Sequence, residues 1–178
     1  MDPAPAVTTE DKELEFEFTR LLHAPRALVF AAWTDPGRLS QWFGPRGFTT
    51  PVCQVDARVG GAYRIVMRSP EGRDYPLKGV FRELVRPELL VMTMDTSEHP
   101  ADWFADLRKA GGVGSTRPDA LVVTVTFDDE GGKTRLRVRS RFLEKADRDA
   151  HLKMGASEGW SQSFERLAEL LGVRMETR

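Results

Sequence analysis

The C-terminal stretch MGASEGWSQSFERLAELLG, residues 154–172, decides the fold, because its apolar side chains recur every three or four residues, as on one face of a helix. The same spacing reaches back to residue 143 and predicts one long helix with Gly172 as its C-terminal cap. Gly155 and Gly159 interrupt the pattern, and each costs about 0.5–1 kcal/mol relative to alanine inside a helix. Either they let the helix bend or approach a sheet beside a cavity, or both face solvent as tolerated residues.

Most of the chain before this helix alternates apolar and polar residues, which is typical of strands with one buried face. ELEFEFTRLL, residues 13–22, is the first such strand. APRALVFAAWTDPGRLSQWFG, residues 24–44, then predicts two short helices, the second around residues 38–42. Further strands are expected at residues 48–57, 61–68, 76–86, 88–95, 120–128 and 133–142. Turn sequences such as DDEGGK join consecutive strands and predict an antiparallel meander.

These elements predict an α+β fold in which a curved antiparallel sheet of six or seven strands wraps around the long C-terminal helix. Because a curved sheet and a straight helix cannot stay in contact along their whole length, a gap between them is expected. Residues 1–12 are predicted to be a flexible tail and residues 13–172 a single domain. Residues 97–119, which we call the lid segment, interrupt the sheet and are either a lid presenting Trp103 and Phe104 or a disordered loop.

Composition narrows the classes of partner. The net charge is −1, with 40% apolar and 30% charged residues, so neither a nucleic-acid partner nor a membrane is expected. Cys53 is the only cysteine, which suits a reducing compartment. The start MDPAPAVTTEDKE carries acidic residues and prolines where a secretory signal would have basic and then apolar residues. The sequence therefore predicts a cytoplasmic protein.

The chain resembles the START-like, Bet v-like helix-grip (SRPBCC) superfamily, and within it the homologues of the C-terminal domain of the heat-shock-protein-90 ATPase activator. The resemblance spans residues 13–171 and rests on LLHAPRALVFAAWTDPGRLSQWFGP, GGAYRIVMRSPEGRDYPLKGVFREL, PDALVVTVTFDD and EGWSQSFERLAELL, in that order. It implies a sheet that grips the last helix, with an apolar cavity between them and with Trp160 and Phe164 at its closed end. It says little about function, because such folds host many activities.

Strand parity assigns side chains to this cavity. The arginines of AYRIVMR and RLRVRSRF are expected to face water, which turns the alternate residues inward. The predicted cavity residues are Tyr63, Ile65, Met67, Phe81, Met92, Met94, Val138, Ser140, Phe142, Met154 and Trp160. A wall rich in methionine and aromatic rings suits an apolar or aromatic ligand, although each of these residues could simply fill a core.

The sequence contains no catalytic constellation and predicts no metal site and no cofactor, because its histidines are scattered rather than set at ligand spacing. Glu83, Asp95 and His151 are the candidate polar groups of the cavity. Glu83 shares strand parity with Phe81, and a half-buried carboxylate with a raised pKa could act as a base. The alternatives are a carboxylate paired with an arginine and a solvated histidine.

Three functions follow as hypotheses. The first is a module that binds a hydrophobic or aromatic small molecule under the lid segment. The second, implied by the resemblance, is a co-chaperone-like module with a chaperone partner. The third is a cyclase, dehydratase or hydrolase of a hydrophobic metabolite, which would need Glu83, Asp95 and Tyr63 to converge in the cavity. Exposed edge strands would also allow a homodimer, although no motif requires one.

Overall fold

The computed structural model describes residues 9–177 and contains one antiparallel sheet of eight strands in the order β2-β3-β4-β5-β6-β7-β1-β8. The strands are β1 Glu15–Leu22, β2 Thr49–Val55, β3 Ala62–Arg68, β4 Asp74–Val85, β5 Leu89–Thr93, β6 Leu121–Glu130, β7 Lys133–Phe142 and β8 Met175–Glu176. The helices are α1 Thr9–Glu13, α2 Arg26–Thr34, α3 Pro36–Trp42, α4 Ala101–Lys109, α5 Lys145–Lys153 and α6 Ala156–Leu171. The predicted α+β meander is confirmed. The eighth strand, β8, lies beyond the predicted domain end and pairs with β1.

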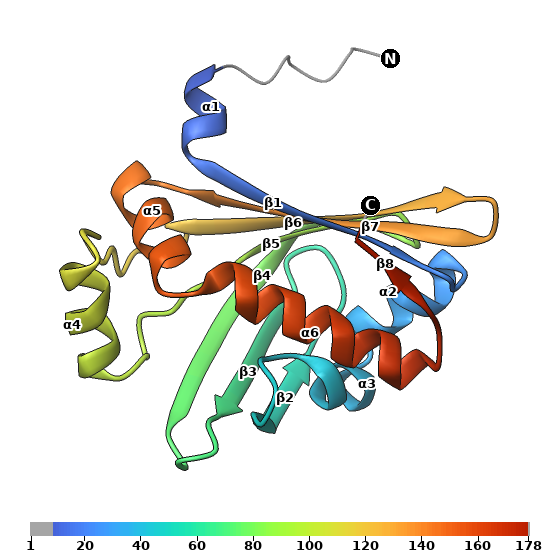
Figure 1. Cartoon of the computed structure of the whole chain (residues 1–178), viewed down its shortest axis with the longest axis horizontal. Coiled ribbons are helices and arrows are strands. Elements are labelled where there is room, and N and C mark those ends of the chain that lie inside the picture. Colours follow the sequence, from blue (N-terminus) through green and yellow to red (C-terminus); the bar gives the residue numbers. More distant parts are fainter. Residues whose placement is uncertain (1–8, 178) are drawn as a thin grey trace.

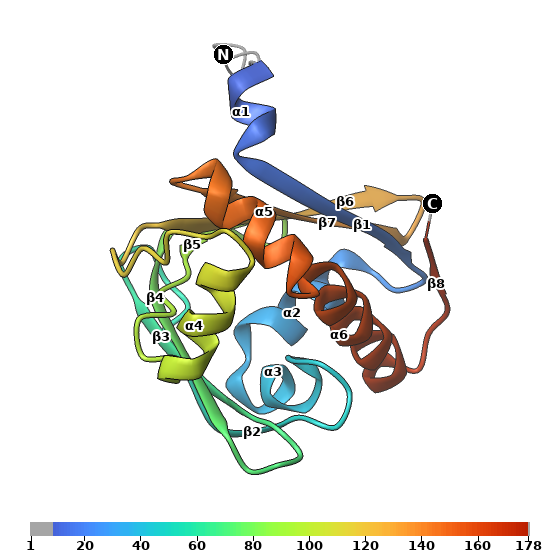
Figure 2. The ribbon, with the colours of Figure 1, turned by 60° about the vertical axis from the view of Figure 1, so that its left-hand side comes forward.

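The sheet is curved, and α2, α3 and α6 lie on its concave side (Figure 1). In Figure 2, strands β5 to β2 bend away from β6, β7 and β1, so that the concave face of the sheet surrounds α2, α3 and α6. Aromatic side chains fill one end of the enclosed space. The rings of Trp33 and Trp42 lie 4.9 Å apart, and Phe164 of α6 is fully buried beside them in the same core. Large buried rings supply much of the hydrophobic stabilisation of such a core.

The C-terminal segment forms two helices, α5 and α6, so the prediction of one long helix was wrong at Gly155. This residue has φ +93° and precedes α6. L-amino acids avoid that left-handed conformation, whereas glycine adopts it without steric cost. Gly155 therefore turns the chain between the two helices. The predicted cap is confirmed at Gly172, which ends α6 with φ +65°.

Replacing Gly155 with alanine is expected to lower the free energy of unfolding by about 1–2 kcal/mol, because the left-handed backbone is strained for alanine. The added methyl group would meet no atom within 4 Å, so the loss would come from the backbone alone. Urea denaturation of Gly155→Ala measures it. The matched control is Gly159→Ala inside α6, which is expected to gain about 0.5–1 kcal/mol. Losses of similar size in both variants would contradict this assignment.

The structure places a helix in the segment that was predicted to be a tail and another in the segment that was left open between a lid and a disordered loop. The predicted tail falls largely on residues 1–8, which lie outside the described residues, whereas Thr9–Glu13 forms α1. The lid segment contains α4. Asp102 at the start of this helix forms an ion pair with Arg73 of the β3–β4 turn, and Leu107 near its end is buried. The lid segment is therefore an ordered part of the fold.

Candidate functional site

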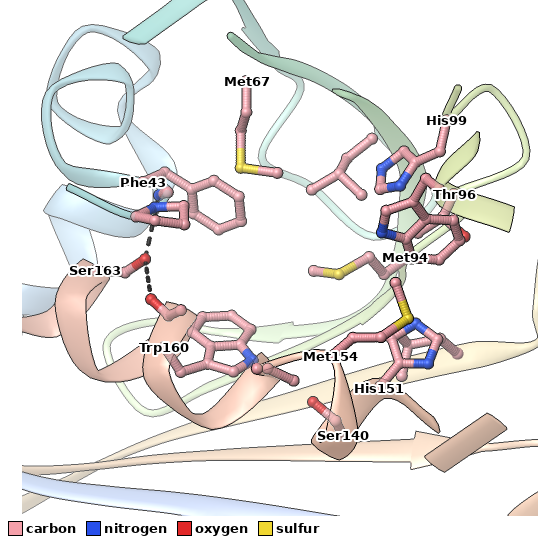
Figure 3. A pocket seen from close by; sticks show the side chains of 18 of the residues that line it. Phe43, Met67, Met94, Thr96, His99, Ser140, His151, Met154, Trp160 and Ser163 are labelled. Carbon is pink, nitrogen blue, oxygen red and sulfur yellow. Dashed lines mark hydrogen bonds between the residues drawn. The ribbon is translucent and has the colours of Figure 1, made fainter. Parts of the chain in front are cut away.

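A cavity of about 260 Å³ lies between α6, the concave face of the sheet and the lid segment (Figure 3). Its walls are mostly apolar, and it is open to solvent rather than enclosed. The break between α5 and α6 lies at its edge, because Met154, Gly155 and Gly159 are among the residues that line it. The gap that was expected between the curved sheet and the helix is thus present as a cavity.

Several of the predicted site residues surround this cavity. Met67, Ser140 and Phe142 come from the sheet, and Met94 directly follows β5; Trp103, His151 and Trp160 come from the helices, and Met154 directly follows α5. Figure 3 shows Met67, Met94 and Met154 distributed around the empty space, with Trp160 at its lower wall. Thioether and aromatic groups thus come from β3, the end of β5, α6 and the α5–α6 junction.

Five other predicted cavity residues lie outside it. Tyr63, Ile65, Phe81 and Met92 pack beside Trp33 around a separate void of about 20 Å³, and Val138 is fully buried in the core. These side chains do lie on the inner face of the sheet, but α2 and α3 occupy the space that they face. Phe104 lines another small void, beside α5.

The predicted polar groups Glu83 and Asp95 also lie outside the cavity. Glu83 is exposed, because a β-bulge between Phe81 and Glu83 adds a residue to β4 and breaks the parity that linked their side chains. Asp95 is buried, but its carboxylate accepts a hydrogen bond from the Ser97 N–H at 2.8 Å and lies 3.9 Å from Lys78 Nζ. These are contacts of a structural carboxylate.

Sequence reasoning missed part of the wall. Phe16 of β1 lines the cavity, and the alternation Leu14, Phe16, Phe18 could have identified it. Phe43 and His99 also line it, but both lie outside helices and strands, where no periodicity applies. Their positions depend on contacts between segments that are distant in the sequence.

Two hydrogen-bonded side chains of α6 fix the loop that carries Gly44 and Pro45 onto the cavity. The Gly44 N–H donates to Ser163 Oγ at 3.2 Å, and this hydroxyl donates to the Gly159 carbonyl at 2.9 Å. Arg166 donates to the carbonyls of Gly44 and Pro45 at 2.8 and 3.1 Å. The loop therefore lies opposite Gly159, and the cavity extends into the space that a side chain at 159 would fill.

The polar side chains of the wall are His99, Trp103 and His151, together with the hydroxyl residues Thr96, Ser140 and Ser163. The Trp103 ring lies 4.5 Å from the His99 ring and 5.5 Å from the His151 ring, both roughly perpendicular to it. His151 Nδ1 is 2.7 Å from the Asp147 carbonyl, which can only accept, so Nδ1 carries the proton and Nε2 of the neutral ring presents a lone pair. Both ring nitrogens of His99 are buried and have no hydrogen-bond partner among residues 9–177.

Burial keeps both imidazoles neutral. It lowers the pKa of His99 from 6.5 to about 4, and the neighbouring His151 contributes to the shift. Burial also lowers the pKa of His151. At neutral pH this wall therefore offers a ligand neutral donors and acceptors rather than a positive charge.

The free energy of unfolding is expected to fall as the pH is lowered from about 6.5 to about 4. In this window the unfolded chain protonates His99 while the folded protein does not, so acid favours the unfolded state. The loss would be about 1–3 kcal/mol. Urea denaturation at several pH values measures it, with His99→Leu as the variant whose profile should be flatter. Equal slopes in both proteins would show that the buried His99 ring does not set this dependence.

Two further properties concern the described part of the chain. Between residues 9 and 177, no three His, Cys, Asp or Glu side chains gather closely enough to hold a metal ion. Over the same residues, no helix has the length and apolar character needed to cross a membrane.

Comparisons with known proteins give one family. The family model described as "Activator of Hsp90 ATPase homolog 1-like protein" matches residues 23–172. A solved structure from Nitrosomonas europaea is 29% identical, with a TM-score of 0.74 over 91% of this chain and 96% of that one. One from Chromobacterium violaceum is 28% identical, with a TM-score of 0.70 over 88% and 96%. An HSP90 activator from Plasmodium falciparum, 20% identical with a TM-score of 0.61 over 92% and 99%, shares the fold alone. No curated protein matches the sequence.

Proposed function

The chain belongs to the family of Activator of Hsp90 ATPase homolog 1-like proteins, and within it we propose that this protein binds a small apolar or aromatic molecule in the cavity between α6 and the sheet. The observation that carries the proposal is a cavity of about 260 Å³ with mostly apolar walls in an otherwise packed domain. Ligand sites are typically clefts with mostly apolar walls and a few polar groups, and this cavity has that character.

The arrangement of the wall supports binding rather than simple imperfect packing. Gly159 leaves free space where any other residue would place a side chain, at a cost to the stability of α6. The lid segment contributes Trp103 to the wall and is fastened in place over it. We therefore assign the lid segment the role of covering the bound molecule.

Native mass spectrometry of protein purified from its own host tests this proposal. We expect an additional mass that disappears on denaturation, and we expect Gly159→Leu prepared in the same way to lack it. The same adduct on both proteins would place the ligand outside the cavity and contradict the proposal. A bare mass for both would favour the second candidate.

The second candidate is a co-chaperone-like module that contacts Hsp90, and the family match is the observation that favours it. The experiment is a pull-down with the host's Hsp90 at micromolar protein, together with its ATPase rate. If the protein recovers Hsp90 and raises its ATPase rate, and Gly159→Leu does the same, the function belongs to the surface of the protein rather than to the cavity. No recovery at this concentration would contradict it.

The third hypothesis, an enzyme, receives less support from the geometry. Glu83 and Asp95 lie outside the cavity, and Tyr63 donates its hydroxyl proton to the Thr93 carbonyl. The single cysteine, Cys53, is a free thiol whose pKa burial raises to about 11, which disfavours the reactive thiolate. A chain without intrachain disulfides suits the cytoplasm, which we propose as its location. A homodimer through an edge strand such as β2 stays a prediction.

A further inference from the structure

We propose that Nε2 of His151 accepts a hydrogen bond from the bound molecule, so that the cavity selects an uncharged aromatic molecule with a hydroxyl donor. This role rests on the proposed binding function and adds to it a specificity-determining residue and the chemical class of the ligand. The polar groups of the wall differ in whether they are already paired within the protein, and this difference assigns the role to His151.

His151 lies in the last turn of α5, and its ring is fixed on the cavity wall. Its Nδ1 donates to the Asp147 carbonyl at 2.7 Å, and the ring lies 4.7 Å from the Phe142 ring and 5.5 Å from the Trp103 ring. These contacts orient a neutral imidazole and leave Nε2 as an acceptor. In the described part of the chain Nε2 has no hydrogen-bond partner, but it keeps accessible surface, in contrast to both nitrogens of His99. Because the ring lines the cavity (Figure 3), this lone pair is available to a bound molecule.

The three hydroxyl side chains of the wall do not distinguish a ligand donor from a ligand acceptor. Ser163 is already paired in both directions, since it accepts from the Gly44 N–H and donates to the Gly159 carbonyl. The hydroxyls of Thr96 and Ser140 form no hydrogen bond within the described part of the chain. A hydroxyl donates as readily as it accepts, so these two side chains can pair with either kind of ligand group.

The remaining polar groups specify what the ligand must offer. The indole N–H groups of Trp103 and Trp160 only donate, so an acceptor on the ligand can be paired by them or by a hydroxyl of the wall. Nε2 of His151 pairs only with a donor, and a ligand without one would bury this lone pair unpaired. A ligand hydroxyl meets both requirements. A carboxylate would lose its hydration without a positive partner, because burial lowers the pKa of His151 and no lysine or arginine is among the described residues of the wall.

The rest of the wall favours an aromatic body for the ligand. Thioether groups lie on several sides of the cavity (Figure 3), from Met67, Met94 and Met154. Sulfur contacts the edges of aromatic rings favourably. Phe43 and Trp160, whose rings are 6.1 Å apart and nearly perpendicular, offer ring faces and edges for similar contacts. A phenol with a short alkyl chain combines this body with the hydroxyl that the imidazole acceptor requires.

The test compares 4-propylphenol, 4-propylanisole and 4-propylbenzoate by calorimetric titration at pH 7.5. The phenol donates and accepts, the methyl ether only accepts, and the benzoate is an anion. We expect the wild-type protein to bind the phenol about 5–10-fold more tightly than the ether, and to bind the benzoate weakest. An ether that binds as tightly as the phenol would overturn the requirement for a donor. A benzoate that binds as tightly would overturn the requirement for an uncharged ligand.

Substitutions in the wall identify the acceptor. His151→Leu is expected to remove the preference for the phenol over the ether, whereas His151→Gln, whose side-chain carbonyl can still accept, should keep part of it. Thr96→Val and Ser140→Ala are the controls, and each should keep the preference within about twofold. In the wild-type protein, the ¹⁵N resonance of His151 Nε2 should shift more with the phenol than with the ether, which tests the same contact without a substitution.

The outcomes separate the role of His151 from the binding function on which it rests. An unchanged preference in a folded His151→Leu protein would overturn this role, as would a preference that disappeared only in Thr96→Val or Ser140→Ala. If Gly159→Leu still abolished binding of the probes in those cases, the cavity would stand as the binding site. If Gly159→Leu left the binding of every probe unchanged, the cavity itself would be excluded.

Discussion

Replacing Gly159 with leucine will abolish binding in the cavity without unfolding the protein. A Cβ atom added at Gly159 would meet only Pro45 Cγ, at 3.9 Å, which is an ordinary van der Waals contact. The remaining carbons of leucine would extend into the cavity that Gly159 lines and occupy the space of the ligand. The substitution also removes a glycine from the interior of α6, which should stabilise the helix by about 0.5–1 kcal/mol.

The expected loss of affinity for an aromatic probe such as 4-propylphenol is on the order of 100-fold, because the leucine and the ligand compete for the same space, and forcing extra methylene groups into a filled site costs about 1–3 kcal/mol. Calorimetric titration measures the affinity, and urea denaturation measures the stability. Gly159→Ala is the control, since one methyl group takes little of the cavity and should leave the affinity within about threefold. Full affinity in a folded Gly159→Leu protein would show that ligands bind elsewhere.

The structure gives a separate reason for each of the two glycines near the start of the last helix. Gly155 is needed for a backbone conformation, because its φ of +93° turns the chain between α5 and α6. Gly159 is needed for space, because it lies inside α6 and lines the cavity. The first interpretation of the sequence, a bend beside a cavity, agrees with this geometry. The helical spacing runs across the break, so periodicity alone could not distinguish one bent helix from two.

The fold was predictable from the sequence because it depends on local patterns. Strands β6 and β7 alternate strictly, with Val123, Val125 and Phe127 buried on one face, and tight turns join neighbouring strands. Parity fails where a strand contains a bulge, as it does between Phe81 and Glu83, because the extra residue leaves no trace in the pattern. Because of this extra residue, Glu83, which parity had placed in the cavity as a candidate base, is exposed to solvent.

The cavity was only partly predictable, because parity assigns a side chain to the inner face and does not say what faces it. Tyr63 and Met67 lie on the same face of β3, yet α2 and α3 cover Tyr63 whereas Met67 lines the cavity. His99 reaches the wall only because the lid segment folds back over the sheet. Such placements depend on contacts between distant segments, which one sequence does not specify.

The lid segment leads to the second large expected effect, because one buried carboxylate fastens its far end. Asp147 of α5 accepts hydrogen bonds from the N–H groups of Val113 at 2.7 Å, Gly114 at 2.9 Å and Ser115 at 3.4 Å. The backbone approaches so closely that a Cβ at Gly112 would lie 2.9 Å from Asp147 Oδ1. Three consecutive backbone N–H groups thus donate to one carboxylate. Only aspartate and glutamate have a negatively charged acceptor that can anchor a backbone segment in this way.

Replacing Asp147 with alanine is therefore expected to lower the free energy of unfolding by about 2–3 kcal/mol, since buried N–H groups would lose a charged acceptor. Hydrogen exchange should quicken first in α4 and in residues 112–115, while β6 and β7 stay protected, because local opening begins where few contacts remain. Asp149→Ala is the control: this carboxylate pairs with Lys145 and Arg148 at the surface of the same helix, and its loss should cost about 0.5 kcal/mol or less. If α4 exchanged only together with the core strands in Asp147→Ala, Asp147 would stabilise the whole domain rather than fasten a lid. Selective opening of α4 together with weaker binding of 4-propylphenol would instead connect this anchor to the retention of the ligand.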